Sequence, residues 1–235
     1  MVTSINHEIP AIETEYFKTC VTRDDLIDQG LLNTTDLLNI IGFEPIIQEG
    51  HESYVHHYTM YGYTSPECPT MMGVQELVYV WAPGEGPVSL PDYLGTPLFG
   101  EDGFQSFEIE VHYNNPKFIE GIIDSSGVRV YWTSQPREQQ VGILTLGDPV
   151  IRLIGQSVGD GLSMHSFECP GSCSSLLGQS VTVLREYLHM HEIGARMTNE
   201  QIRDGKVIRQ AAIDYWEFDQ NGNAAVQQDP YVVEP

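Results

Sequence analysis

The chain has 235 residues, 41% of them hydrophobic, and its 33 acidic against 11 basic side chains give a formal net charge of −22 at pH 7. This length and hydrophobic content allow one or two domains with a buried core and exclude wholesale disorder. The negative surface would repel phosphate backbones, which argues against nucleic acid as a partner, whereas a cationic or neutral small molecule could approach it. The simplest interpretation of the charge is solubility in a salty or crowded compartment.

One stretch near the N-terminus resembles a helix. Residues 22–43 could begin a short helix at Thr22 or Asp24, either of which suits an N-cap, but Gly30 interrupts the stretch. The stretch is therefore a short helix or a loop with turns.

Most of the chain consists of short segments that alternate apolar and polar residues or are rich in β-branched and aromatic ones. Turn-forming residues separate these segments, and the chain contains 22 glycines and 14 prolines. Many short strands at regular spacing predict an all-β sandwich. The predicted strands are 75–83, 104–113, 125–134, 141–147, 179–191 and 207–218.

A polar segment that contains Pro136, residues 133–140, predicts a domain boundary. The expected domains are residues 1–136 and residues 137–235. No apolar run is long enough to span a membrane, and the first residues, MVTSINHEIP, lack the basic start and apolar stretch of a signal peptide. Because the chain also stops abruptly at DPYVVEP, we expect it to be a fragment of a longer secreted precursor.

The chain has four cysteines, Cys20, Cys68, Cys169 and Cys173. A zinc ribbon would need a second closely spaced pair besides Cys169 and Cys173, and the sequence has none. We therefore interpret the four as forming two structural disulfides, although their number alone indicates an oxidising compartment only weakly.

Five of the eight histidines form three tight groups: the tandem pair His56 and His57, the single His112 in FEIEVHYNNP, and His189 with His191 in EYLHMHEIG. Such grouping among hydrophobic residues is typical of a transition-metal site, and an all-imidazole set favours copper or zinc. Three histidines in one half and two in the other predict two metal sites, the second incomplete. The histidines without such neighbours, interpreted as surface or structural residues, are His7, His51 and His165.

In a β-strand, the three groups of histidines would differ in the direction of their side chains. His189 and His191 would face the same side of a strand and form a bidentate clamp. His56 and His57 would face opposite sides of a regular strand, so they can share a metal only at a strand end or a twist. His112 lies on the polar side of its strand, together with the glutamates two and four residues before it. Each group taken alone is also compatible with ordinary surface histidines.

Five segments occur in this order along the chain: YVHHYTMYGY, SFEIEVHYNNP, IEGIIDSSGVRVYWT, GILTLG and YLHMHEIGARM. Their order resembles that of the copper type II, ascorbate-dependent monooxygenase family. The resemblance covers nearly the whole chain, and DSSG followed by VRVYWT is more similar to the dopamine β-hydroxylase branch than to the peptide-amidating branch. It implies two β-sandwich domains of jelly-roll type with a solvent-filled cleft between them, the second domain truncated here at its C-terminus.

The resemblance also implies the roles of the histidines. His56, His57 and His112 would hold an electron-transfer copper, and His189 and His191 would be two of the three ligands of a catalytic, oxygen-binding copper. The third ligand in the family is a methionine well downstream, and no methionine of this chain lies in a matching context. The implied reaction is hydroxylation of an aliphatic C–H bond with O2 and two electrons from ascorbate.

Further expectations come from the same resemblance. It implies a disulfide between Cys20 and Cys68, and partners outside this chain for Cys169 and Cys173, which are here unpaired or paired with each other. Tyr187 stands where the peptide-amidating branch has an arginine that grips the substrate carboxylate. A small amine is therefore the expected substrate, and the secretory pathway or extracellular space is the expected location.

Two other interpretations stay open from the sequence. A three-histidine site also suits a zinc hydrolase or hydratase, although such an enzyme would leave the separate pair His189 and His191 unexplained. The chain could also be a copper-binding or interaction module that catalyses nothing.

Overall fold

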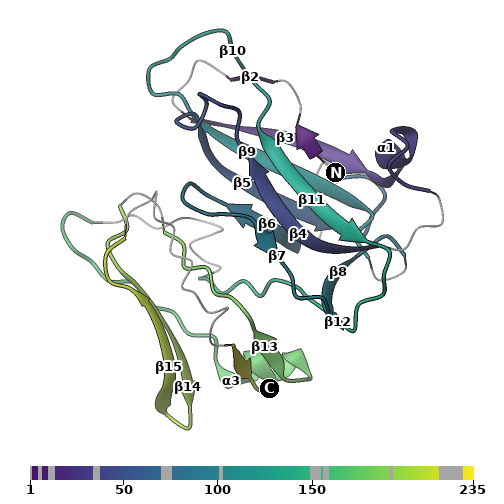
Figure 1. Ribbon diagram of the computed structural model, residues 1–235. Coiled ribbons are helices and arrows are strands. Elements are labelled where there is room, and N and C mark those ends of the chain that lie inside the picture. Colours follow the sequence, from purple (N-terminus) through teal and green to yellow (C-terminus); the bar gives the residue numbers. More distant parts are fainter. Residues whose placement is uncertain are drawn as a thin grey trace. The chain divides into compact units, whose positions relative to one another are not determined.

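The structure is a computed structural model, and it describes residues 2–4, 7–9, 14–33, 38–69, 76–100, 103–148, 155, 159–190, 193–216 and 230–235. The chain divides into two compact units, Met1–Ile143 and Leu144–Pro235, which we call unit 1 and unit 2. Both consist of strands with little helix (Figure 1). The all-β class predicted from the sequence is confirmed.

Unit 1 contains two mainly antiparallel sheets. The first has four strands in the order β3-β9-β5-β6, and the second has the order β1-β11-β4-β8-β12, with β7 also paired to β4. Strands β2 and β10 pair with each other separately. The strands are β1 Val2–Ser4, β2 His7–Ile9, β3 Thr14–Thr22, β4 Leu38–Ile46, β5 Val55–Tyr63, β6 Glu76–Trp81, β7 Val88–Ser89, β8 Leu94–Leu98, β9 Ser106–Asn114, β10 Ile122–Asp124, β11 Gly127–Thr133 and β12 Gln139–Gln140.

A hydrophobic core joins the two sheets of unit 1. In β9, Phe107, Ile109 and Val111 alternate with more polar residues and are at most 5% exposed. Ile40 and Val130 from the other sheet belong to the same cluster. Alternation therefore buries one face of each sheet against the other, which is the sandwich arrangement expected from the sequence.

The helix-like stretch contains both a helix and a strand. Thr22 caps helix α1, Arg23–Asp28, through a capping box in which Asp25 N donates to Thr22 Oγ1 (3.2 Å) and Thr22 N donates to a carboxylate oxygen of Asp25 (2.8 Å). Hydrogen bonds from Thr22 lower the pKa of Asp25. The end of the stretch belongs to β4, where alternate side chains, such as Ile40, are buried in the core. Tertiary packing thus overrides the helical pattern there.

Unit 2 contains two separate two-stranded sheets and a short helical segment. Strand β13 pairs with β16, and β14 pairs with β15. The β14–β15 hairpin, visible in Figure 1, turns at Asp204 and Gly205, whose φ angles of 51° and 71° are those of a type I′ turn. The elements are α3 Gly171–Ser174, η1 Ser175–Leu177, β13 Val181–Val183, β14 Met197–Arg203, β15 Lys206–Ile213 and β16 Tyr231–Val233.

Two predicted strands are shorter or absent in the structure. Residues 141–147 form no regular strand, and within 179–190, the described part of the other segment, only Val181–Val183 is a strand. An alternating pattern becomes a strand only where a neighbouring strand pairs with it, and the sequence does not reveal which neighbours are within reach. The predicted boundary after residue 136 and the division of the two units after Ile143 lie close together in the chain. Among the residues that the structure describes, no helix is long and apolar enough to span a membrane.

Candidate metal centre

His56 and His57 lie at the start of β5, where a β-bulge interrupts its pairing with β9. Val55 pairs with Tyr113 and His57 pairs with His112, so that His56 is the extra residue of β5. The residues on either side of the tandem pair are buried, whereas both histidines are partly exposed. A bulge turns two adjacent side chains to the same face, which a regular strand does not allow.

His112 reaches the same place from β9. It lies on the face of the strand that carries Glu108 and Glu110, opposite the face that Ile109 and Val111 bury in the core. Although this is the polar face, His112 is only 7% exposed. The centroids of the other two imidazole rings lie 4.5 and 4.7 Å from its own.

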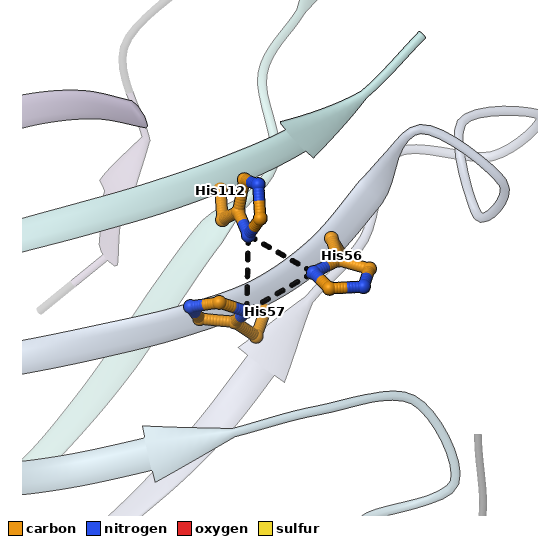
Figure 2. Close-up of side chains that lie close together, drawn as sticks. All are labelled: His56, His57 and His112. Carbon is orange, nitrogen blue, oxygen red and sulfur yellow. Dashed lines mark hydrogen bonds between the residues drawn. The ribbon is translucent and has the colours of Figure 1, made fainter. Parts of the chain in front are cut away.

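The three imidazoles converge on their Nδ1 atoms (Figure 2). The Nδ1 atoms of His56 and His112 are 2.9 Å apart, those of His56 and His57 are 3.2 Å apart, and those of His57 and His112 are 3.3 Å apart. Ligands at tetrahedral angles around one ion, with metal–nitrogen bonds of about 2.0–2.1 Å, lie about 3.3 Å from one another. The spacing of the three nitrogens is therefore that of three ligands to a single metal ion.

The protonation of imidazole also favours a cation at this place. Each ring nitrogen of a neutral imidazole is either a donor or an acceptor. Among three mutually close Nδ1 atoms, two must have the same role, so at least one contact would oppose two lone pairs or two N–H groups. A metal ion removes this conflict, because all three lone pairs then point towards it. The cluster consists of three histidines with no carboxylate or thiolate, which suits copper or zinc.

The face that carries the cluster is acidic. Glu108 and Glu110 lie 3.2 and 3.5 Å from the ammonium group of Lys18, which neutralises only one of the two charges. Burial lowers the pKa of Lys18, but the two carboxylates together raise it by more, so that the pKa is above its usual value. The remaining negative charge near the histidines favours binding of a cation.

His189 lies in unit 2, in the segment that follows β13. Its side chain is exposed, and its ring stacks on Tyr187 with centroids 5.9 Å apart and the planes at 11°. The ring of Trp216 lies edge-on to His189 at 6.1 Å. His191, the predicted second ligand, lies outside the residues that the structure describes. The clamp formed by these two histidines therefore stays a prediction.

His51, which the sequence predicts to be a surface or structural residue, contacts a buried carboxylate that the sequence does not reveal. Asp124 is fully buried, and the Nδ1 atom of His51 lies 2.7 Å from one of its carboxylate oxygens. Asp124 begins the segment DSSG, and an aspartate before serine and glycine is ordinarily a turn residue. The local sequence therefore gives no signal that this carboxylate is buried.

The cysteines differ between the two units. Cys20 on β3 forms a disulfide with Cys68, and their Cα atoms are 6.0 Å apart. Cys169 and Cys173 are free and exposed. The interpretation of the four cysteines as two disulfides is therefore wrong for this pair, and of the two states that the resemblance left open the structure has the unpaired one. Desolvation by neighbouring atoms and the hydrogen bond with Cys173 raise the pKa of the Cys169 thiol. The disulfide lies in unit 1, which also holds the three-histidine cluster.

Comparison with known proteins agrees with this geometry. Residues 1–120 match the family model described as copper type II ascorbate-dependent monooxygenase, N-terminal domain. The chain is 28% identical over 212 residues to a tyramine beta-hydroxylase of Caenorhabditis briggsae, and this match covers 84% of this chain and 35% of the relative. It is 28% identical over 221 residues to human dopamine beta-hydroxylase, and this match covers 86% of this chain and 34% of the relative.

A third relative is the human DBH-like monooxygenase protein 1, which is 29% identical over 201 residues, or 75% of this chain and 32% of the relative. The chain thus spans about a third of the length of the curated relatives it matches. Because the family model matches more than half of the 235 residues, the chain belongs to the copper type II ascorbate-dependent monooxygenase family.

Proposed function

We propose that the protein to which this chain belongs hydroxylates an aliphatic C–H bond of a small amine, with O2 as oxidant and ascorbate as electron donor. Membership in the family supports the reaction class. The observation that carries the proposal is the convergence of the Nδ1 atoms of His56, His57 and His112 within 3.3 Å of one another. In this proposal residues 1–136 form the electron-transfer copper domain, and residues 137–235 form the incomplete oxygen-binding copper domain.

The three-histidine cluster would hold the electron-transfer copper. Copper bound by imidazoles supplies single electrons by cycling between Cu(I) and Cu(II). The part of the protein is to keep His56, His57 and His112 neutral, with all three Nδ1 lone pairs directed to one point. The bulge in β5 turns the imidazoles of His56 and His57 to one face, and the pairing of β5 with β9 places His112 beside them.

His189 and His191 would be two ligands of the oxygen-binding copper. The exposure of His189 supports this role, because a metal ion bound to its ring would be accessible to O2 and substrate and would keep an open coordination position. Tyr187 stacks on His189 and fixes the plane of the imidazole. Packing that holds a ligand's ring in one orientation tunes a metal site.

An amine is the substrate class that the chain supports best. The relatives named above include enzymes called tyramine and dopamine beta-hydroxylases. Tyr187 replaces the arginine that binds a substrate carboxylate in the peptide-amidating branch, so a peptidylglycine would lack its partner here. The net charge of −22 favours the approach of an ammonium-bearing molecule. The Cys20–Cys68 disulfide is compatible with folding in the secretory pathway.

Copper content and electron paramagnetic resonance (EPR) of the oxidised protein test the metal assignment. We expect a type 2 copper signal, of which His57→Ala removes the part that comes from the three-histidine cluster. His165→Ala, a change at an exposed histidine outside the three groups, should leave the whole signal in place. Zinc in the cluster without a copper signal would support a zinc hydrolase instead.

Oxygen uptake with ascorbate and tyramine tests the reaction in the full-length protein. His57→Ala should stop turnover that depends on reduction, and His189→Ala should abolish hydroxylation while one copper stays bound. Full activity of either variant would contradict the assigned roles. The same assay on this chain alone separates an enzyme from a copper-binding module without catalysis.

A further inference from the structure

Asp124, the last residue of β10, holds a network of hydrogen bonds inside unit 1. Its side chain is 0% exposed. One carboxylate oxygen lies 2.7 Å from His51 Nδ1 and accepts a bond from Ser126 Oγ (2.8 Å). The other accepts bonds from Tyr113 Oη (2.8 Å) and from the backbone N of Ser126 (3.1 Å). A buried carboxylate is tolerated only when it is well hydrogen-bonded, so this arrangement strongly favours one geometry.

The network assigns a tautomer to His51. Its Nδ1 must carry the proton, because the carboxylate of Asp124 can only accept. Its Nε2 then accepts from the side-chain amide of Gln48 at 3.4 Å. The amide oxygen of Gln48 in turn accepts two bonds of 2.7 Å from the backbone and hydroxyl of Ser125. The loop before β5 is thereby attached to the turn that follows β10.

The two outer members of the network flank the bulge that assembles the metal centre. Tyr113 follows His112 in β9 and pairs with Val55, the last residue of β5 before the bulge. The carbonyl oxygen of His51 accepts a bond of 3.3 Å from the backbone N of Val55. Asp124 therefore binds, through Tyr113 and His51, to both chain segments that enter the bulge.

Fixing these two segments matters because the bulge sets the direction of the histidines. A shift of one residue in strand pairing turns every side chain of a strand to its other face. With such a shift, His56 and His57 could not both point towards His112. The hydrogen bonds through Asp124 connect the loop before β5 to the end of β9. They oppose such a shift at the bulge, where the hydrogen bonds between the two strands are interrupted.

We propose that Asp124, with Tyr113 and His51, positions the three-histidine centre by fixing the register of the bulge. Asp124, Tyr113 and His51 are positioning residues in this proposal, since none of them contacts the point on which the Nδ1 atoms converge. The inference rests on the proposed function in one respect, namely that the cluster binds copper.

The test compares copper binding by variants of the full chain. Asp124→Asn and Tyr113→Phe each remove part of the network and keep the size of the side chain. We expect a roughly tenfold weaker affinity for Cu(II), the size of effect typical of residues that orient metal ligands. We also expect a changed EPR spectrum of the bound ion. A contribution to folding alone would lower the melting temperature and leave the spectrum of the folded protein unchanged.

Two matched controls make the test specific. Glu44 accepts hydrogen bonds from Arg129 and Tyr131 in the other sheet of unit 1, so Glu44→Gln disrupts a carboxylate network that shares no residue with that of Asp124. Its affinity and spectrum should equal those of the wild type. At position 51, His51→Asn keeps a hydrogen-bond donor near the place of Nδ1 and should have the wild-type spectrum. His51→Leu has no donor there and should have a changed spectrum.

The outcomes separate this inference from the proposed function. A wild-type chain without a copper signal sensitive to His57→Ala would contradict the proposed function. A wild-type chain that binds copper, together with unchanged affinity and spectrum in Tyr113→Phe and His51→Leu, would overturn the positioning role alone. If Asp124→Asn does not fold, Tyr113→Phe and the pair of His51 variants still decide the matter.

Discussion

The histidines predicted to bind metal have different surroundings in unit 1 and in the described part of unit 2. His56, His57 and His112 lie on β5 and β9, the two inner strands of a four-stranded sheet. His189 follows β13, whose described pairing is with β16 alone. A two-stranded sheet is only marginally stable by itself, whereas an inner strand is held on both edges. Neighbouring strands on both edges are therefore what gives the three histidines of unit 1 fixed positions.

Burial differs between the units in the same way. Unit 1 packs two sheets around one core, in which Tyr58 and Met60 are completely buried. In unit 2, Leu162 and Met164 are 95% and 92% exposed. The described part of unit 2 thus leaves large apolar side chains in contact with solvent. A rigid metal site needs a packed scaffold around its ligands, and the comparison shows that scaffold in unit 1.

Among the residues that the structure describes, each unit contains one buried carboxylate, and the two are bonded differently. In unit 1, Asp124 uses both oxygens. In unit 2, one oxygen of Glu186 accepts bonds from Arg209 Nη1 (3.0 Å), Asn199 Nδ2 (3.1 Å) and the hydroxyl of Tyr231. These donors come from β15, β14 and β16, so Glu186 connects both small sheets of unit 2 to the segment that carries His189.

The comparison predicts a large difference in hydrogen exchange. Backbone amides of β9 and β5 should exchange at least about 10³-fold more slowly than those of β14 and β15, because buried inner strands open only when the whole unit unfolds. Peptide-resolved exchange measured by mass spectrometry on the copper-free chain checks this. Equal protection in the two units would show that the hairpin of unit 2 is stabilised as strongly as the sandwich.

Truncating a buried side chain of unit 1 should cost far more stability than truncating a half-exposed side chain of unit 2. Ile109→Ala removes a side chain that is 2% exposed and should cost about 2–5 kcal/mol of unfolding free energy through lost burial and a cavity. The matched change Ile208→Ala, at a side chain on β15 that is about half exposed, should cost less than about 0.5 kcal/mol. Urea denaturation followed by fluorescence measures both, and similar losses would contradict the difference in packing.

The cysteines should show the same contrast. Removing the disulfide by Cys20→Ser opens a loop of 48 residues and should cost about 2–4 kcal/mol, chiefly because the unfolded chain gains freedom. Cys173→Ser in unit 2 should change stability by less than about 0.5 kcal/mol, since Cys173 is free and exposed. Thermal unfolding of the two variants tests this, and a large loss from Cys173→Ser would indicate a role for that thiol in folding.

A smaller effect is expected at the carboxylate of unit 2. Glu186→Gln keeps the shape of the side chain but leaves Arg209 without its negative partner, at a cost of about 1–3 kcal/mol. Amides of β15 and β16 should then exchange faster, while those of β9 stay unchanged. Glu200→Gln alters an exposed glutamate that accepts a bond from Gln210 and serves as the control. Faster exchange in β9 would show that the two units do not unfold independently.

Much of the candidate site could be predicted from the sequence, because the relevant patterns are local. Alternation around His112 places it on the polar face of β9, and the structure has it there. The grouping of the histidines predicted a three-ligand set in the first half of the chain, and His56, His57 and His112 do converge. The shortened strand within 179–191 was not predictable, since its length depends on which segments pair with it.

The sequence by itself determined the all-β class, the choice of the three histidines in the candidate metal centre and the segments that link the chain to its family. These depend on side-chain chemistry and on spacing along one strand. Only the tertiary structure decided how two adjacent histidines face the same way, because a bulge exists only relative to the partner strand β9. It also decided that Asp124 is buried between His51 and Tyr113, residues that are distant in sequence and that the packing of two sheets brings together.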